Sequence, residues 1–180
     1  MCASSAESQP LLLLNRKTWT FDSDGTAKEA AATLRVPFVM VTDFRAQHAY
    51  TIANGETMGL RGERKGVRDM QDIISQNARN DFIPFTVTGL FSEIEVASGC
   101  LSNTAGTIFG ISIPMWAKGI SGPAGLRSVF ISDADKEGKR EGGEIVRSEL
   151  VEGGRIEWSA SGHLHVGMPR GKAWESLEMV

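Results

Sequence analysis

Cysteine is scarce in this sequence, and its placement excludes both a disulfide framework and a cysteine-based metal site. Cys2 and Cys100 are the only cysteines among the 180 residues, and they lie far apart in the sequence. Such usage fits a reducing compartment. Long hydrophobic runs are missing as well. The longest leucine run has four members (Leu11, Leu12, Leu13 and Leu14), which is too short to span a bilayer, and no basic residue precedes it as in a signal peptide.

An excess of positive charge is also absent. Nineteen Lys and Arg residues against 22 Asp and Glu residues give a net charge of −3, which disfavours a protein that binds nucleic acid or acidic membranes over its whole surface. The chain is 41% hydrophobic, enough for one sizeable core. We predict a flexible tail over residues 1–15 and a single globular domain over residues 16–180.

The stretch from Val67 to Ala97 predicts a helix followed by a long strand. Val67, Met70 and Ile73 recur at helical spacing. The strand that follows, residues 82–96, changes its inward parity at Gly89, which predicts one bent strand with a β-bulge.

Further strands are expected on both sides of this stretch, among them the alternating residues 17–21 and the run of residues 126–132. Asn54-Gly55 between apolar runs predicts a hairpin, and Gly153-Gly154 predicts a second one. A short helix is expected over residues 26–33 and a loop over residues 98–106. The fold class is therefore α+β: a mostly antiparallel twisted sheet of about seven to nine strands, packed against one main amphipathic helix.

A cluster of cations precedes the predicted helix. Its four members are Arg61, Arg64, Lys65 and Arg68. Because free N–H groups at a helix start favour anions, cations placed there suit a phosphate or acidic partner that arrives from outside. An exposed basic loop paired with Glu63 and Asp69 is the simpler interpretation, and the sequence leaves both open.

Two apolar features are candidate contact surfaces. The leucine run Leu11–Leu14 could form a short buried strand, or it could dock on a neighbouring subunit or a membrane. Trp116, in a glycine-rich loop, could insert into the same kind of partner or fold back on its own domain.

Histidine and cysteine chemistry finds little support. His163 and His165 would point the same way on a strand and could share a metal ion, but no further ligands follow at suitable spacing. Cys100 has no adjacent base in the sequence, unless His48 or His163 approaches it. We therefore predict no enzyme activity, no catalytic residue, no cofactor and no metal.

The order of several short segments resembles that of rhabdovirus matrix proteins. A strand region, an amphipathic helix, the strand of residues 85–91 and a small-residue loop follow one another as at the start of their globular domain, and residues 129–135 resemble a strand that ends in an acidic cluster. Residues 149–152, 155–158 and 161–164 resemble the C-terminal hairpin. The size is similar to that of the compact matrix proteins of plant rhabdoviruses that replicate in the cytoplasm. The resemblance implies a structural protein of the virion and host cytoplasm. It would self-assemble into a helical lattice, condense the nucleocapsid, and contact the inner envelope leaflet or a glycoprotein tail during budding, with no small-molecule substrate.

Two other classes remain open from the residues. A lipocalin-like barrel would bind a small apolar molecule in a pocket lined by Phe38, Phe85, Phe109 and Trp158. A cupin-like metal enzyme would be built on His163 and His165.

Overall fold

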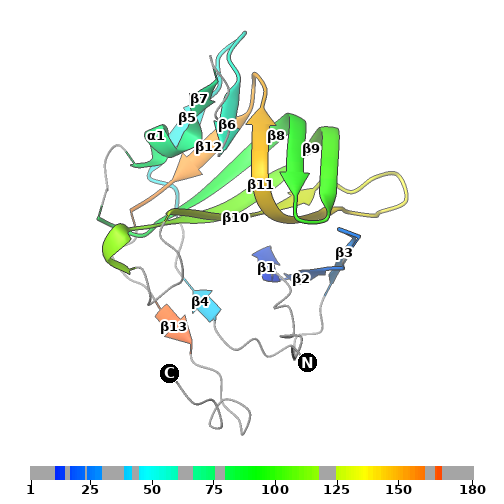
Figure 1. Ribbon diagram of the computed structural model, residues 1–180, viewed down its shortest axis with the longest axis horizontal. Helices are drawn as coiled ribbons and strands as arrows, with labels where there is room; N and C mark the ends of the chain where they lie inside the picture. Colours follow the sequence, from blue (N-terminus) through cyan, green and yellow to red (C-terminus); the bar gives the residue numbers. More distant parts are fainter. Residues whose placement is uncertain are drawn as a thin grey trace, which may run out of the picture.

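The computed structural model describes residues 11–14, 17–22, 24–29, 39–41, 45–60, 67–75, 80–117, 125–160 and 165–167. Its largest element is an eight-stranded sheet in the order β5-β12-β8-β9-β10-β11-β6-β7. These strands are β5 (His48–Thr51), β6 (Met58–Leu60), β7 (Arg68–Asp69), β8 (Ile83–Val96), β9 (Gly99–Ile113), β10 (Gly125–Ser132), β11 (Gly142–Leu150) and β12 (Arg155–Trp158). Figure 1 shows β8 and β9 as the longest, curved ribbons of this sheet.

Four strands of the large sheet form a closed circuit of pairing. β8 pairs with β9, β9 with β10, and β10 with β11, and β11 then pairs with the second half of β8. A two-residue turn at Ala97 and Ser98 joins β8 to β9, where Val96 lies opposite Gly99. The predicted loop over residues 98–106 is therefore wrong, because these residues continue the β8–β9 hairpin.

The core lies mainly between these strands rather than between a sheet and a helix. Phe91 of β8 and Phe130 of β10 are fully buried and meet edge to face, with ring centroids 5.4 Å apart. The same cluster contains Met58, Leu60, Phe85, Val87, Ile94, Ile108, Leu126, Ile145, Leu150, Ile156 and Trp158.

The predicted main amphipathic helix, and with it the predicted fold class, is wrong. Helix α1 (Met70–Ser75) has six residues, and the other described helical segment is the 3-10 turn η1 (Met115–Ala117). Val67 fits the helical spacing but precedes strand β7, and the Asp69 carboxylate accepts a hydrogen bond from Gln71 N at 2.8 Å, as an N-cap does. Met70, Ile73 and Ile74 still join the core. The described residues thus form a mostly β protein.

β11 and β12 do not form the predicted hairpin across Gly153-Gly154. Both run antiparallel to β8 along the same edge: Leu150 lies opposite Phe91, and Arg155 lies opposite Thr88. Residues 151–154 loop out between them. Here Gly89 is required, because a Cβ on it would lie 2.9 Å from both Gly154 Cα and a Leu150 methyl group.

The predicted bulge in β8 exists, but at a different residue. The pairing of β8 with β11 shifts register at Ser92, so the inward row Phe85, Val87 and Phe91 continues past Gly89 and only then gives way to Ile94. Leu90, which was expected to point inward, is 44% exposed. A second shift, at Val146, places an extra residue in β11.

The turn at Asn54-Gly55 is confirmed, but the hairpin is wrong. Gly55 has the positive φ of 78° that such a turn requires. The strands on either side then diverge, since β5 pairs with β12 whereas β6 pairs with β11 and β7.

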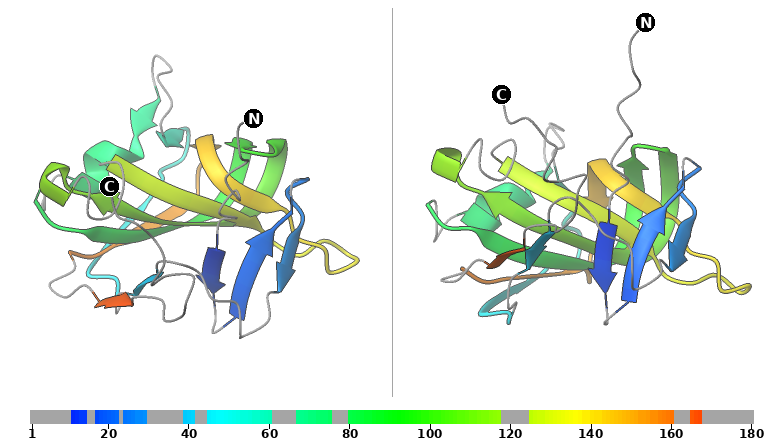
Figure 2. Two further views of the ribbon diagram at one scale, coloured as in Figure 1. Left: turned by 60° about the horizontal axis from the view of Figure 1, so that its bottom comes forward. Right: turned by 90° about the horizontal axis from the view of Figure 1, so that it is seen from below.

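Two small sheets lie below the large sheet in Figure 1, and Figure 2 shows them from two further sides. One contains β1 (Leu11–Leu14), β2 (Lys17–Phe21) and β3 (Ala27–Glu29), and the other pairs β4 (Val39–Val41) with β13 (His165–Gly167). β3 replaces the start of the helix predicted over residues 26–33. It is tied to the large sheet by backbone hydrogen bonds from Ala27 N to Arg140 O at 2.9 Å and from Gly142 N to Gly25 O at 2.8 Å.

Candidate functional site

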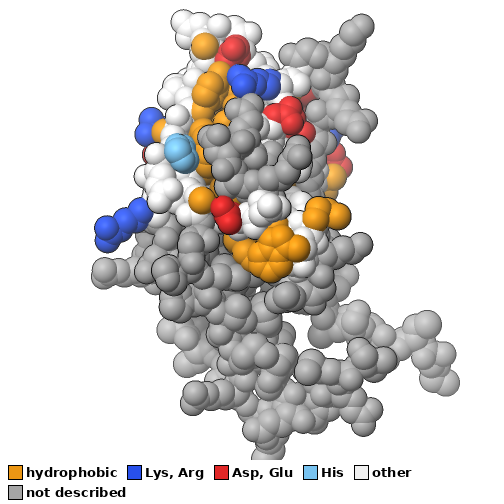
Figure 3. Space-filling view, turned by 90° about the vertical axis from the view of Figure 1, so that its left-hand side faces the viewer, with side chains coloured by type: hydrophobic (Ala, Val, Ile, Leu, Met, Phe, Trp, Pro, Cys, Tyr) orange, Lys and Arg blue, Asp and Glu red, His pale blue; other side chains and the backbone are white. Residues whose placement is uncertain are grey.

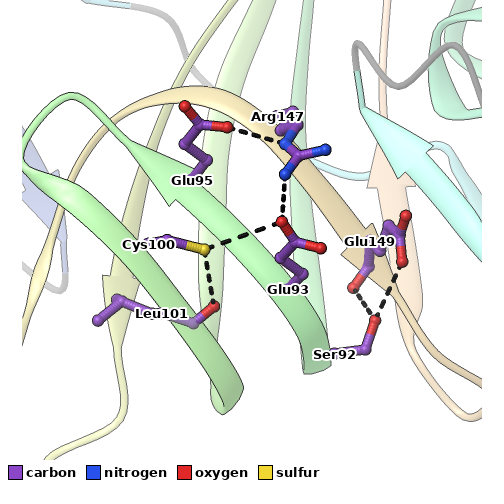
Figure 4. Close-up of polar contacts among 7 residues, drawn as sticks. All are labelled: Ser92, Glu93, Glu95, Cys100, Leu101, Arg147 and Glu149. Atoms are coloured by element: carbon purple, nitrogen blue, oxygen red, sulfur yellow. Dashed lines mark hydrogen bonds and ion pairs between the residues drawn. The ribbon is translucent and has the colours of Figure 1, made fainter.

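One cluster of charged side chains lies where β8, β9 and β11 meet. Arg147 of β11 donates from Nε to Glu95 Oε2 at 2.8 Å and from Nη2 to Glu93 Oε1, so it joins β11 to β8 (Figure 4). Beside it, Ser92 Oγ lies 3.5 Å from Glu149 Oε2. The two register shifts flank this cluster, at Ser92 and Val146, and β-bulges commonly re-aim side chains in this way.

The electrostatics of this cluster do not suit an anionic ligand. Among the described residues, Glu93 and Glu95 both hold the guanidinium of Arg147. The hydrogen bond to Glu95, followed by the charge of Glu93, raises the pKa of Arg147. Cys100 Sγ lies 3.9 Å from Glu93 Oε1. We interpret the cluster as a set of ion pairs that link β11 to β8 and so stabilise the closed circuit of strands.

A second pair, Arg127 and Glu144, lies on the face of the large sheet toward β3. Arg127 Nη2 is 3.5 Å from Glu144 Oε1, and the two side chains are 45% and 46% exposed. Strand register places them: Glu144 lies opposite Val129, which follows Arg127 by two residues on the same face. The sequence does not reveal this pair, because 16 residues and a charged loop separate its members and no local motif joins them.

Apolar side chains surround the Arg127–Glu144 pair. Phe109 of β9 lies opposite Val129, and Ile111 lies opposite Arg127. Ala27 of β3 packs into the same small cluster as Phe109 and Val129. The pair is thus a half-exposed cation and anion beside an apolar wall, the kind of setting in which a small molecule with one charged end and one apolar end can bind.

An exposed apolar surface lies at one end of the large sheet. Met115 and Trp116 of η1 are 76% and 61% exposed, and Figure 3 shows hydrophobic side chains gathered on the side of the molecule that carries η1 and α1. Trp116 is nevertheless held in place, since Nε1 donates to Asn80 O at 2.8 Å and the indole meets the Phe82 ring edge to face. It contacts its own domain, as one of the two sequence interpretations expected.

Comparison with known families assigns the chain. The family model described as alpha-acetolactate decarboxylase matches residues 9–100, which is just over half of the chain. The chain belongs to the alpha-acetolactate decarboxylase family. Arg127 and Glu144 lie beyond the matched residues.

Solved structures agree with the alpha-acetolactate decarboxylase family in fold. The acetolactate decarboxylase of Bacillus subtilis subspecies spizizenii superposes with a TM-score of 0.68 at 20% identity, over 85% of this chain and 68% of that one. The enzyme from Bacillus subtilis strain 168 gives the same TM-score and coverage at 22% identity. A Staphylococcus aureus protein of unknown function, similar to the same enzyme, gives 0.64 at 18% identity, over 83% of this chain and 67% of that one. No curated protein sequence matches the chain significantly.

Membership of the alpha-acetolactate decarboxylase family overturns the functional interpretation of the sequence. The resemblance to rhabdovirus matrix proteins is wrong, and so are the structural, non-enzymatic role, the nucleocapsid, envelope and glycoprotein partners, and the virion location that it implied. The family is named for an enzyme with a small-molecule substrate. Among the described residues, no helix is long and apolar enough to cross a membrane.

The sequence-predicted contact residues do not converge on the Arg127–Glu144 face. Arg61, Arg64 and Lys65 lie outside the described residues, whereas Arg68 lies over the Tyr50 ring, 5.6 Å from its centroid. Leu11–Leu14 form β1, paired with β2. Contact of the four cations with phosphate, contact of the leucines with another subunit, and the division at residue 15 stay predictions.

The two alternative classes have different outcomes: the lipocalin-like pocket does not form, whereas the His163–His165 site of the cupin-like alternative is not tested by the described residues. Phe85 and Trp158 belong to the main core but Phe109 packs on the outer face with Val129, so these side chains do not line one barrel pocket, and Phe38 lies outside the described residues. His163 lies outside them too, and His48 stacks on Trp158 with ring centroids 5.6 Å apart. Within the part of the chain that the structure describes, no three His, Cys, Asp or Glu residues group closely enough to hold a metal ion.

Proposed function

We propose that this protein decarboxylates α-acetolactate or a close analogue of it. Family membership, carried by the match over residues 9–100, is the observation that supports the proposal. The fold shared with two Bacillus subtilis acetolactate decarboxylases is consistent with it.

The reaction sets clear demands on a protein. α-Acetolactate is a carboxylate whose neighbouring carbon carries a hydroxyl and a methyl group and is attached to a ketone. When the bond to the carboxylate breaks, carbon dioxide leaves and the electron pair moves through that carbon to the ketone oxygen. A proton from water then adds to the carbon and gives 3-hydroxybutan-2-one (acetoin). A donor aimed at the ketone oxygen accelerates such a step, because negative charge develops there.

The Arg127–Glu144 face supplies the groups that this substrate requires. A guanidinium presents several N–H donors in a planar fork, which suits two adjacent oxygen atoms. The apolar wall of Phe109, Ile111 and Val129 suits the two methyl groups of the substrate. The Arg147 guanidinium is less suitable, since two carboxylates of the described residues, Glu93 and Glu95, already hold it.

The test is acetoin formation by the purified full-length chain. α-Acetolactate is incubated near neutral pH with and without the protein, and acetoin and carbon dioxide are measured over time. We expect acetoin to form at a rate proportional to protein concentration, and heat-unfolded protein to match the buffer blank. Equal rates with native protein, unfolded protein and buffer would refute the proposed function.

A further inference from the structure

We infer that Arg127 is the anchor for the carboxylate of a small branched hydroxy acid, with Glu144 as the group that competes for the same guanidinium. The choice of ligand rests on the proposed function. The choice of residue rests on the geometry of the described arginines.

Arg127 is incompletely satisfied by its ionic partner. Its one described ion pair, to Glu144, is 3.5 Å long, whereas a charge-assisted N–H···O hydrogen bond measures about 2.7–2.9 Å. A guanidinium has five N–H donors, so this single long contact leaves donors for a ligand. Arg147 differs, since two carboxylates already hold it, one through Nε and the other through Nη2.

The surroundings of Arg127 match a ligand that is partly apolar. Ile111 lies beside it on β9, and Val129 follows it on its own strand. Phe109 and Ala27 extend this apolar surface. By contrast, Arg155 pairs with Glu157 at 3.0 Å, and its neighbours across β5 and β8 are Thr51 and Thr88.

Glu144 lowers the affinity of the Arg127 site for an anion and does not itself bind the ligand. Its carboxylate lies next to the position that a bound carboxylate would occupy, so the two negative charges repel each other. Removal of that charge should therefore tighten binding, whereas a purely structural ion pair would give no gain in affinity when it is broken. This opposite effect of the two partners distinguishes a binding site from a surface salt bridge.

The test measures binding of 2-hydroxy-2-methylbutanoate, an analogue that lacks the ketone and cannot lose carbon dioxide by this route. Calorimetry or ligand-observed NMR gives the dissociation constant of this analogue for the wild-type protein and three variants. We expect Arg127→Gln to weaken binding about tenfold or more, the loss of hydrogen bonds to a charged group. Glu144→Gln should tighten it about two- to fivefold, the size of a surface charge–charge term. Arg147→Gln is the control and should leave it unchanged.

The outcomes separate this inference from the proposed function. Analogue binding that depends on Arg127, without any acetoin formation, supports the anchor and refutes the decarboxylase. Acetoin formation that is equal in wild type and Arg127→Gln refutes the anchor and supports the decarboxylase. The anchor is also overturned if the analogue fails to bind, or if Arg127→Gln and Arg147→Gln weaken binding equally. Arg127 is half-exposed, so its variant should keep the wild-type circular dichroism spectrum, and that spectrum is recorded for each chain.

Discussion

Replacement of Phe91 by alanine should strongly destabilise the protein, whereas replacement of the preceding residue, Leu90, by alanine should not. Phe91 is fully buried and meets Phe130 across the strand circuit, whereas Leu90 is 44% exposed. A buried Phe→Ala change costs about 3–5 kcal/mol, because it removes apolar contacts and leaves a cavity. Since small domains are stable by only about 5–15 kcal/mol, Phe91→Ala should lose about a third or more of the unfolding free energy. Leu90→Ala should cost about 1 kcal/mol or less, because only about half of its side chain is buried.

Urea unfolding followed by circular dichroism measures both variants. The comparison is sharp because Phe91 and Leu90 are adjacent in the same strand, so both variants have the same change in backbone propensity to within a few tenths of a kcal/mol. The alternation in the sequence predicted that Leu90 points inward with Ile94, which would make Leu90→Ala the costly change. Equal losses for the two variants, or a larger loss for Leu90→Ala, would refute the placement of the bulge at Ser92. A double variant with Phe130→Ala should also show a coupling of about 0.5–1.5 kcal/mol, the range for edge-to-face aromatic pairs.

Two further predictions concern a close contact and a titrating group. Gly110→Ala should lower the free energy of unfolding by about 1–3 kcal/mol, as overpacking does, because its Cβ would lie 2.2 Å from Phe85 Cζ. Adding Phe85→Leu to this variant should recover part of that loss in urea unfolding. An unchanged stability of Gly110→Ala would contradict the contact. The hydrogen bond from Thr26 N lowers the pKa of Asp24 below 3.8, so its contribution to stability is present above the unfolded pKa and is lost as the pH falls through the folded one. Asp24→Ala should therefore be slightly less stable than wild type at pH 7, and the two should converge below about pH 4; a difference that persists at pH 2 would contradict this assignment.

Local signals in the sequence located several strands but not their partners. Alternation in Lys17–Phe21 predicted β2, and the run of Leu126 to Ser132 predicted β10 to within one residue. The Asn54-Gly55 pair marks a turn correctly, whereas the turn near Gly153-Gly154 lies at Glu152 and Gly153. A turn signal cannot tell a hairpin from a loop that lets the chain continue along the same neighbour. The chain from β11 to β12 continues along the same neighbour, because β8 is long enough to pair with both strands.

The predicted central helix was wrong for a related reason. Helical spacing over Val67–Ile74 is real, but Asp69 caps the helix only after β7 has paired with β6. Tertiary pairing therefore takes the first residues of the pattern into a strand, and local propensity cannot anticipate it. The resemblance to matrix proteins had the same weakness, since it relied on short strand and turn segments in a given order, and such segments recur in many β proteins.

Arg127 and Glu144 of the candidate site could not be singled out from the sequence. In the sequence, the clearest candidates for anion binding are cations that lie close together along the chain, such as Arg61 to Arg68. In a sheet, however, neighbours are set by register, and Arg127 meets Glu144 only because β10 and β11 are paired with Val129 opposite Glu144. The number of nearby carboxylates then decides which arginine can accept an anion. Among the described residues, Arg147 has two ionic partners, whereas Arg127 has one partner at 3.5 Å and apolar neighbours. A double substitution tests this logic: Glu93→Gln with Glu95→Gln should free Arg147 to bind simple anions, yet should not give it the preference for a branched hydroxy acid that the Arg127 face supplies.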